Sequence, residues 1–156
     1  SITKQFTGAA ILKLEERRKL KVTDSITKFF KDVPEDKRGI TVHQLLTHTA
    51  GFEHDVIAFG EFPSRDESVR KTLDSRLKLK PGEKYAYSNA GYALLAAIIE
   101  IASGEPYERF LYENLWKPAG MLKTGNLIPR FTDEETGRGY DFSADLGRLG
   151  GRKMDK

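Results

Sequence analysis

The start of the chain places the tightest constraint on the fold, because residues 2–20 contain no proline and predict one long helix. Its first three turns are nearly apolar on all sides, which predicts a helix buried inside a domain, and the charged residues 15–19 bring its far end to solvent. Ser1 and Lys4 are three residues apart, so they share one helical face. A lysine near the buried end is costly without a partner or a task. We therefore interpret Ser1 and Lys4 as a candidate nucleophile and its base.

The remaining chain predicts further helices and no alternating strand of useful length. Ile26 faces inward from a short segment, and another helix beginning near residue 65 ends by Pro81. The most hydrophobic helix spans residues 90–102, closes at Gly104, and is followed by a helix that begins near Pro106. Two pairs have the capping-box spacing of a helix start: Thr41 with Gln44, and Ser64 with Glu67. We expect residues 1–156 to form a single, mostly α-helical subdomain, with a flexible tail at residues 147–156.

Composition narrows the function classes. With 38% hydrophobic and 31% charged residues and no long apolar run, the sequence predicts a soluble chain without a membrane span. The net charge of +3 comes from mixed acidic and basic residues and gives no reason to expect nucleic acid binding. Cysteine is absent, and the three histidines at positions 43, 48 and 54 do not have zinc-site spacing. We expect neither a metal nor a cofactor, and we interpret His48 as a buried hydrogen-bonding residue at a helix end.

The Ser-x-x-Lys pattern is weak by itself, because it occurs four times. Three copies, at Ser25, Ser68 and Ser75, lie in segments whose pattern indicates a solvated surface. Only the copy at Ser1 opens a helix with apolar following turns. A serine hydroxyl needs a neighbour that removes its proton, and a lysine does so only when neutral, which requires its pKa to fall from about 10.4. Burial lowers the pKa of a lysine, and a helix N-terminus stabilises a developing oxyanion.

A second candidate motif is Tyr87-Ser88-Asn89, in a loop before the hydrophobic helix. A phenol near an ammonium loses its proton more easily, so Tyr87 could share acid and base duties with Lys4. Asn89 offers a donor and an acceptor to a substrate amide or acyl group, and it is also a candidate N-cap for the helix that follows. The second Tyr-x-Asn, at Tyr112, falls within a helix and is interpreted as structural.

Four blocks of sequence resemble the serine beta-lactamase and penicillin-binding superfamily, in particular its class C beta-lactamase-like branch. They are residues 1–4, 41–52, 81–95 and 118–124, and their order and spacing are more specific than either short motif. The resemblance implies that the chain is the helical portion of an α/β (α+β) fold, with the large antiparallel sheet largely missing. It also implies a periplasmic or secreted location.

By position, the resemblance implies that Ser1 is the acylated nucleophile, that Lys4 and Tyr87 act jointly as base and acid, and that Asn89 holds the substrate. The expected function is a serine hydrolase that forms an acyl-enzyme on a small-molecule or peptide amide or ester. The superfamily's third motif, Lys/His-x-Gly, is absent, so we expect a second chain or segment to complete the sheet. Three alternatives stay open: a non-catalytic penicillin-recognising or scaffold module, an inactive fragment that lacks the third motif, and an N-terminal nucleophile whose own amine is the base.

Overall fold

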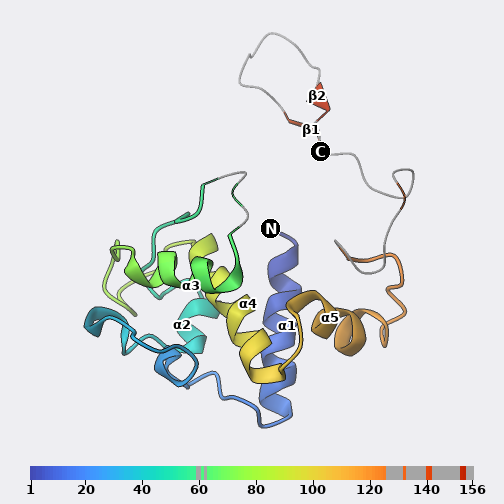
Figure 1. Ribbon diagram of the computed structural model, residues 1–156, viewed down its shortest axis with the longest axis horizontal. Coiled ribbons are helices and arrows are strands. Elements are labelled where there is room, and N and C mark those ends of the chain that lie inside the picture. Colours follow the sequence, from blue (N-terminus) through green and yellow to red (C-terminus); the bar gives the residue numbers. More distant parts are fainter. Residues whose placement is uncertain (59–60, 62, 126–131, 133–139, 142–151, 154–156) are drawn as a thin grey trace.

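Helices are the main regular secondary structure of the computed structural model, which describes residues 1–58, 61, 63–125, 132, 140–141 and 152–153 (Figure 1). The α-helices are α1 (Thr3–Glu16), α2 (Val42–Leu46), α3 (Arg65–Asp74), α4 (Asn89–Ser103) and α5 (Tyr107–Leu111). Two 3₁₀ turns, Ile26–Lys28 and Glu35–Lys37, precede α2, and a π-helical turn, Tyr112–Trp116, follows α5. Two short strands, β1 (Tyr140–Asp141) and β2 (Arg152–Lys153), pair antiparallel with Tyr140 opposite Lys153. The prediction of a mostly helical chain is confirmed.

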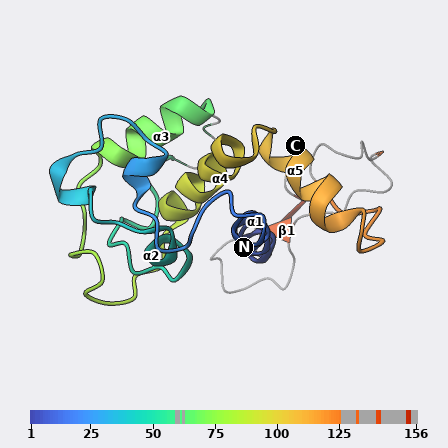
Figure 2. The same cartoon turned by 90° about the horizontal axis from the view of Figure 1, so that it is seen from below.

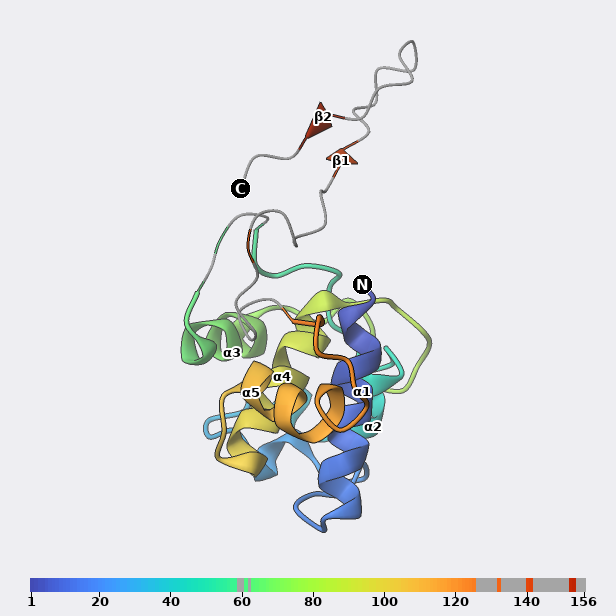
Figure 3. The same ribbon diagram turned by 90° about the vertical axis from the view of Figure 1, so that its right-hand side faces the viewer.

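Helix α4 is the centre of the packing, because α1, α2, α3 and α5 all contact it. It lies between α1 and α3 (Figure 2), and α5 lies across α1 and α4 (Figure 3). Its apolar residues Leu94, Leu95, Ile98 and Ile99 are fully buried. A helix that is hydrophobic on all sides is stable only where neighbours surround it, so the composition of α4 accounts for its central place.

Local capping chemistry determines several helix ends. The two predicted capping boxes are present: Thr41 with Gln44 at the start of α2, and Ser64 with Glu67 at the start of α3. Gly104, with φ 77°, closes α4 in the left-handed conformation that glycine adopts without steric cost.

Helix α1 ends at Glu16, four residues before the predicted end at residue 20. The amide of Arg18 donates to the Glu15 carbonyl and the amide of Lys19 donates to the Leu14 carbonyl, which is the Schellman pattern of a helix terminus. Arg18 occupies the left-handed position, with φ 59°, where glycine is usual. The sequence therefore lacks the glycine that normally marks such an end. Similarly, α3 ends at Asp74 rather than near Pro81, because Ser75 is extended.

One face of α1 is exposed, so the prediction that this helix is buried on all sides was wrong. Among the described residues, α4, α5 and the π-helical turn cover one side, where Ile11 and Leu14 are buried. On the other side Ile2 is 76% exposed and Leu12 is 57% exposed. We call Ile2, Ala9 and Leu12 the outer stripe of α1.

The predicted flexible tail, residues 147–156, lies outside the described residues except for β2. In the part of the chain that the structure describes, no helix combines the length and apolar character that crossing a membrane requires.

Candidate active site

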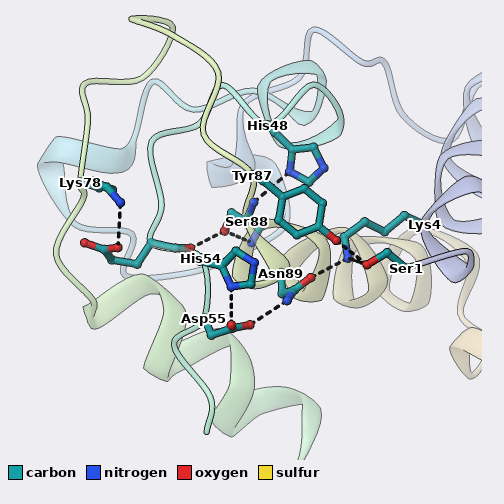
Figure 4. A network of polar contacts seen from close by, with 11 residues as sticks. Ser1, Lys4, His48, His54, Asp55, Lys78, Tyr87, Ser88 and Asn89 are labelled. Atoms are coloured by element: carbon teal, nitrogen blue, oxygen red, sulfur yellow. Dashed lines mark hydrogen bonds and ion pairs between the residues drawn. The ribbon is translucent and has the colours of Figure 1, made fainter. Parts of the chain in front are cut away.

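The four residues singled out from the sequence come from two stretches of the chain, residues 1–4 and 87–89, and meet at one point (Figure 4). Ser1 precedes α1, and Lys4 lies in its first turn. Tyr87 ends the loop before α4, and Asn89 is the first residue of that helix. Because α1 packs directly against α4, the N-terminal ends of both helices present their side chains to the same space.

Hydrogen bonds connect all four side chains. The Oγ of Ser1 and the Oη of Tyr87 are 2.5 Å apart. The Nζ of Lys4 donates to Ser1 Oγ at 3.5 Å and to Asn89 Oδ1 at 2.6 Å. The Lys4 amine also lies 4.8 Å from the centroid of the Tyr87 ring. Lys4 is half-buried rather than buried, so burial isolates it from water less than the sequence suggested.

Ser88, and not Asn89, is the N-cap of α4, which corrects the capping role considered for Asn89. The buried Oγ of Ser88 accepts from the amide of Gly91 at 3.1 Å and donates to the carbonyl of Glu53 at 2.6 Å. Both residue types are good caps, but the helix needs only one. The side chain of Asn89 is thereby left to contact Lys4 and Asp55.

Two further residues belong to this network and were not predicted. The carboxylate of Asp55 accepts from Asn89 Nδ2 at 2.7 Å and from His54 Nδ1. Asp55 therefore fixes the Asn89 amide so that its oxygen faces Lys4. Both His54 and Asp55 are exposed, in the irregular segment that follows Phe52. No local sequence pattern marks them.

Aromatic rings enclose the site from the side of α2. His48 stacks on Tyr87 with ring centroids 4.6 Å apart, and on Tyr92 with centroids 4.9 Å apart. Its Nδ1 accepts from the backbone amide of Ser88 at 3.1 Å. His48 is half-buried and hydrogen-bonded at the end of α2, close to what the sequence predicted.

Charges in the network shift two acids in the same direction. The Lys4 amine, and then the Ser1 hydroxyl, hold the pKa of Tyr87 below its ordinary value. Hydrogen bonds from Asn89 and then His54 lower the pKa of Asp55, so its carboxyl is ionised at neutral pH. The site thus contains a hydroxyl, a nearby cation and a phenol with an increased tendency to ionise, the combination required to activate an alcohol nucleophile.

The other Ser-x-x-Lys copies do not contact Ser1, Lys4, Tyr87 or Asn89. Lys78 lies at the edge of the network, where it pairs with the carboxylate of Glu53 at 3.8 Å (Figure 4). Lys28 pairs with Asp24 at 2.6 Å, and Lys71 pairs with Glu61 at 2.9 Å on the exposed face of α3. Asn114, of the second Tyr-x-Asn, bonds the carbonyl of Phe110 at 2.9 Å within its own helix. Across the described residues, His, Cys, Asp and Glu side chains do not gather in groups of three or more that could hold a metal ion.

The helical fold, together with a serine, a lysine and a tyrosine in mutual contact, is that of the serine beta-lactamase and penicillin-binding superfamily. The chain belongs to the Beta-lactamase family, whose sequence model matches residues 1–154.

Individual relatives agree with this assignment. The putative penicillin-binding protein PbpX of Bacillus subtilis (strain 168) is 34% identical over 125 residues, which is 80% of this chain and 31% of that protein. The crystal structure of a penicillin binding protein from Bacillus halodurans matches with a TM-score of 0.75 and 25% identity over 96% of this chain and 48% of its own. A beta-lactamase/D-alanine carboxypeptidase from Yersinia pestis, complexed with citrate, matches with a TM-score of 0.71 and 31% identity over 86% of this chain and 41% of its own. The chain spans about 30% of the length of the curated relatives it matches.

Proposed function

We propose that this chain carries the nucleophile and the acid–base groups of a serine hydrolase that forms an acyl-enzyme on an amide or ester. One observation carries the proposal: Ser1 Oγ lies 2.5 Å from Tyr87 Oη and 3.5 Å from Lys4 Nζ. A general base must lie within hydrogen-bond reach of the proton it removes, and Tyr87 meets that condition.

The hydrogen bonds allow one path for the proton, in which Ser1 donates to Tyr87. Lys4 donates to Ser1 Oγ, so the Ser1 hydroxyl proton is free to point toward Tyr87 Oη. As Oγ bonds to the substrate carbonyl carbon, its proton passes to the Tyr87 phenolate, whose charge the Lys4 amine stabilises. The proton then passes to the leaving nitrogen or oxygen as its bond to carbon breaks, which leaves an ester on Ser1. Water hydrolyses that ester with the same pair acting as base and acid.

Asn89 is proposed to bind the acyl group of the substrate. Its Oδ1 accepts from Lys4 at 2.6 Å and its Nδ2 donates to Asp55 at 2.7 Å, so the amide cannot flip without losing both bonds. An amide nitrogen carries two donor hydrogens, and one remains for a substrate carbonyl. The relatives add support, because they are named as penicillin-binding proteins and as a beta-lactamase/D-alanine carboxypeptidase, which makes a beta-lactam a suitable probe.

Covalent labelling tests the proposal. The chain is incubated with a fluorophosphonate or a fluorescent penicillin, and the adduct is located by intact mass and peptide mapping. We expect one adduct on Ser1, none in Ser1→Ala, and an unchanged adduct in Ser68→Ala, which removes the serine of another Ser-x-x-Lys. An adduct that persists in Ser1→Ala, or a native chain that takes no label, contradicts the proposal.

Burst kinetics with a chromogenic ester separate a hydrolase from a non-catalytic penicillin-recognising module. A hydrolase releases a burst of product followed by a steady rate, because the acyl-enzyme turns over. One equivalent of product without a steady phase supports the module instead.

We also propose that another segment or a second copy of the chain covers the outer stripe of α1. Ile2 and Leu12 are more than half exposed, and burying apolar area of this kind stabilises an association. Light scattering on the native chain and on Leu12→Lys tests this, with self-association that the substitution reduces as the expected result. A native chain that stays monomeric and resists proteolysis counts against it.

A further inference from the structure

His48 follows α2 in the left-handed backbone conformation. Its φ is 57°, in a region that glycine occupies readily and where asparagine, aspartate and histidine are the most frequent other residues. Ordinary turn bonds hold the chain there: the His48 amide donates to the Leu45 carbonyl and the Thr49 amide donates to the Gln44 carbonyl. These bonds form the Schellman pattern of a helix terminus, and His48 has the left-handed position in it, as Arg18 has at the end of α1.

His48 holds the Tyr87 segment at three points (Figure 4). Its backbone carbonyl accepts from the amide of Ala86 at 2.8 Å, and its Nδ1 accepts from the amide of Ser88 at 3.1 Å. Between these bonds its ring stacks on the Tyr87 ring at an interplanar angle of 28°. One residue therefore fixes the backbone on both sides of Tyr87 and the plane of its phenol.

We propose that His48 is the positioning residue for Tyr87, and that protonation of its imidazole releases Tyr87 and switches off acylation of Ser1. The inference rests on the proposed function of Ser1 and Tyr87. Because Nδ1 accepts a hydrogen bond, a neutral ring carries its proton on Nε2. A protonated imidazole has two donors and no acceptor, so the bond from the Ser88 amide is lost.

The surroundings oppose a charge on this ring. Four titratable groups face the imidazole: Lys4 from α1, Tyr85 and Tyr87 from the loop before α4, and Tyr92 from α4. Tyr92 stacks on one side of the imidazole and Tyr85 meets it edge-on with centroids 5.7 Å apart. Burial, and then the Lys4 amine, hold the pKa of His48 below its ordinary value of 6.5. The ring is therefore neutral at pH 7, and its hydrogen bond with the Ser88 amide is intact.

A pair of substitutions separates positioning from titration. His48→Asn keeps an acceptor oxygen at the place of Nδ1 and tolerates the left-handed backbone, but it does not titrate. His48→Ala removes both the acceptor and the ring. The matched control is His43→Asn, because His43 is an exposed histidine on α2 and lies outside the network. His54→Asn is a second control, because the His54 ring also lies beside Tyr87, with centroids 5.2 Å apart.

The readout is the rate of Ser1 labelling between pH 4.5 and 8. Because the Tyr87 phenolate is the base, its own protonation lowers the rate about tenfold per pH unit toward acid, and protonation of His48 should steepen this fall to about 100-fold per unit below the pKa of the imidazole. His48→Asn should lose the steeper part only and keep most of the rate at pH 7, whereas His43→Asn keeps the steeper part. His48→Ala should be slower at every pH, by about 10- to 100-fold, since a small displacement of a catalytic group has effects of that size. A steeper fall that survives in His48→Asn, or disappears in His54→Asn, overturns the inference.

A second measurement does not depend on labelling. Nitrogen-15 NMR reports the tautomer of His48, and hydrogen exchange reports protection of the Ser88 amide. We expect a proton on Nε2 at pH 7, and loss of Ser88 protection as the ring titrates. If labelling fails but these changes occur, the proposed function fails, and the role of His48 in positioning Tyr87 stands. A Ser88 amide with the same protection above and below the pKa of His48 contradicts the proposed release of Tyr87.

Discussion

The tetrapeptide Ser-Ile-Thr-Lys occurs twice in this chain, at residues 1–4 and at residues 25–28, and the two copies have different surroundings. The first copy leads into α1 and contacts a phenol and an amide from the start of α4. In the second copy, Ser25 caps a 3₁₀ turn by accepting from the amide of Thr27, and it donates to the carbonyl of Arg38 at 2.6 Å. The lysine of that copy, Lys28, pairs with the carboxylate of Asp24.

The difference shows that the tetrapeptide supplies a hydroxyl and an amine, and that the residues around it determine what this hydroxyl and amine do. Ser25 has both a donor and an acceptor role within the backbone, so its hydroxyl is committed to structure. The hydroxyl of Ser1 is exposed, and among the described residues it bonds only to Tyr87 and Lys4, the two groups that could take its proton or stabilise its anion. The four predictions below test this contrast, from the largest expected effect to the smallest.

The largest expected difference is between the two lysines. Lys4→Met should lower the rate of Ser1 labelling by about 10²- to 10⁴-fold, the usual contribution of general acid–base catalysis. Lys28→Met should leave the rate within about twofold, because its ion pair with Asp24 is remote from the site. Labelling time courses followed by intact mass make the comparison. Equal loss of rate in both variants would remove the distinction between the copies.

The pH dependence of Tyr87 sharpens the same contrast. Its lowered pKa means that the phenolate forms at lower pH than in an ordinary tyrosine, so labelling should rise with pH until that pKa is passed. Ultraviolet difference titration should show one of the six tyrosines ionising early. This signal should disappear in Tyr87→Phe. It should move to higher pH in Lys4→Met, since Lys4 is the larger cause of the shift, and it should not move in Lys28→Met. An early transition that persists in Tyr87→Phe belongs to another tyrosine and contradicts the assignment.

Ser25→Ala should affect stability and not chemistry. Loss of a capping hydroxyl costs about 1 kcal/mol of the free energy of unfolding, which is roughly a fivefold change in the folded-to-unfolded ratio. Urea denaturation measures this change, and the labelling rate of the folded protein should stay the same. Ser68→Ala, which removes a serine from α3 rather than a cap, serves as the control. A Ser25→Ala variant as stable as the native chain would show that its hydroxyl is not structural.

The smallest expected effect concerns the Lys28 ion pair itself. A pair four residues apart at the surface contributes about 0.3–0.5 kcal/mol, and salt screens it. Lys28→Met should therefore lower stability by no more than this amount in dilute buffer, and the difference should shrink at high salt. The free energies of unfolding of both proteins, measured at two salt concentrations, provide the check. A loss well above 1 kcal/mol would mean that Lys28 has a role beyond the pair with Asp24.

The features predicted correctly from the sequence were those with local causes. The capping boxes at Thr41 and Ser64 need only residues three positions apart, and Gly104 marks the end of α4 by its own conformational freedom. The end of α1 was missed because Arg18 adopts a left-handed conformation without a glycine to announce it. The residues around Arg18 give no signal in the sequence that this position is left-handed.

The candidate site was predictable in part. Ser1, Lys4, Tyr87 and Asn89 were found through spacing and through the resemblance to a known superfamily, and the structure brings their side chains together. Their chemical roles stay proposals. Asp55 was not found, because its contact with Asn89 joins residues 34 positions apart and depends on how the segment after Phe52 folds back. The cap of α4 was assigned to Asn89 because two good capping residues are adjacent, and only the backbone geometry distinguishes them.

The neighbouring positions 88 and 89 divide two kinds of work between them. Ser88 ties the start of α4 to Glu53, while Asn89 faces Lys4. Damage at the first should appear as a lower melting temperature, and damage at the second as a slower reaction in a protein of normal stability. Substitutions at these two adjacent positions could therefore change the stability of the fold and the rate of the reaction independently.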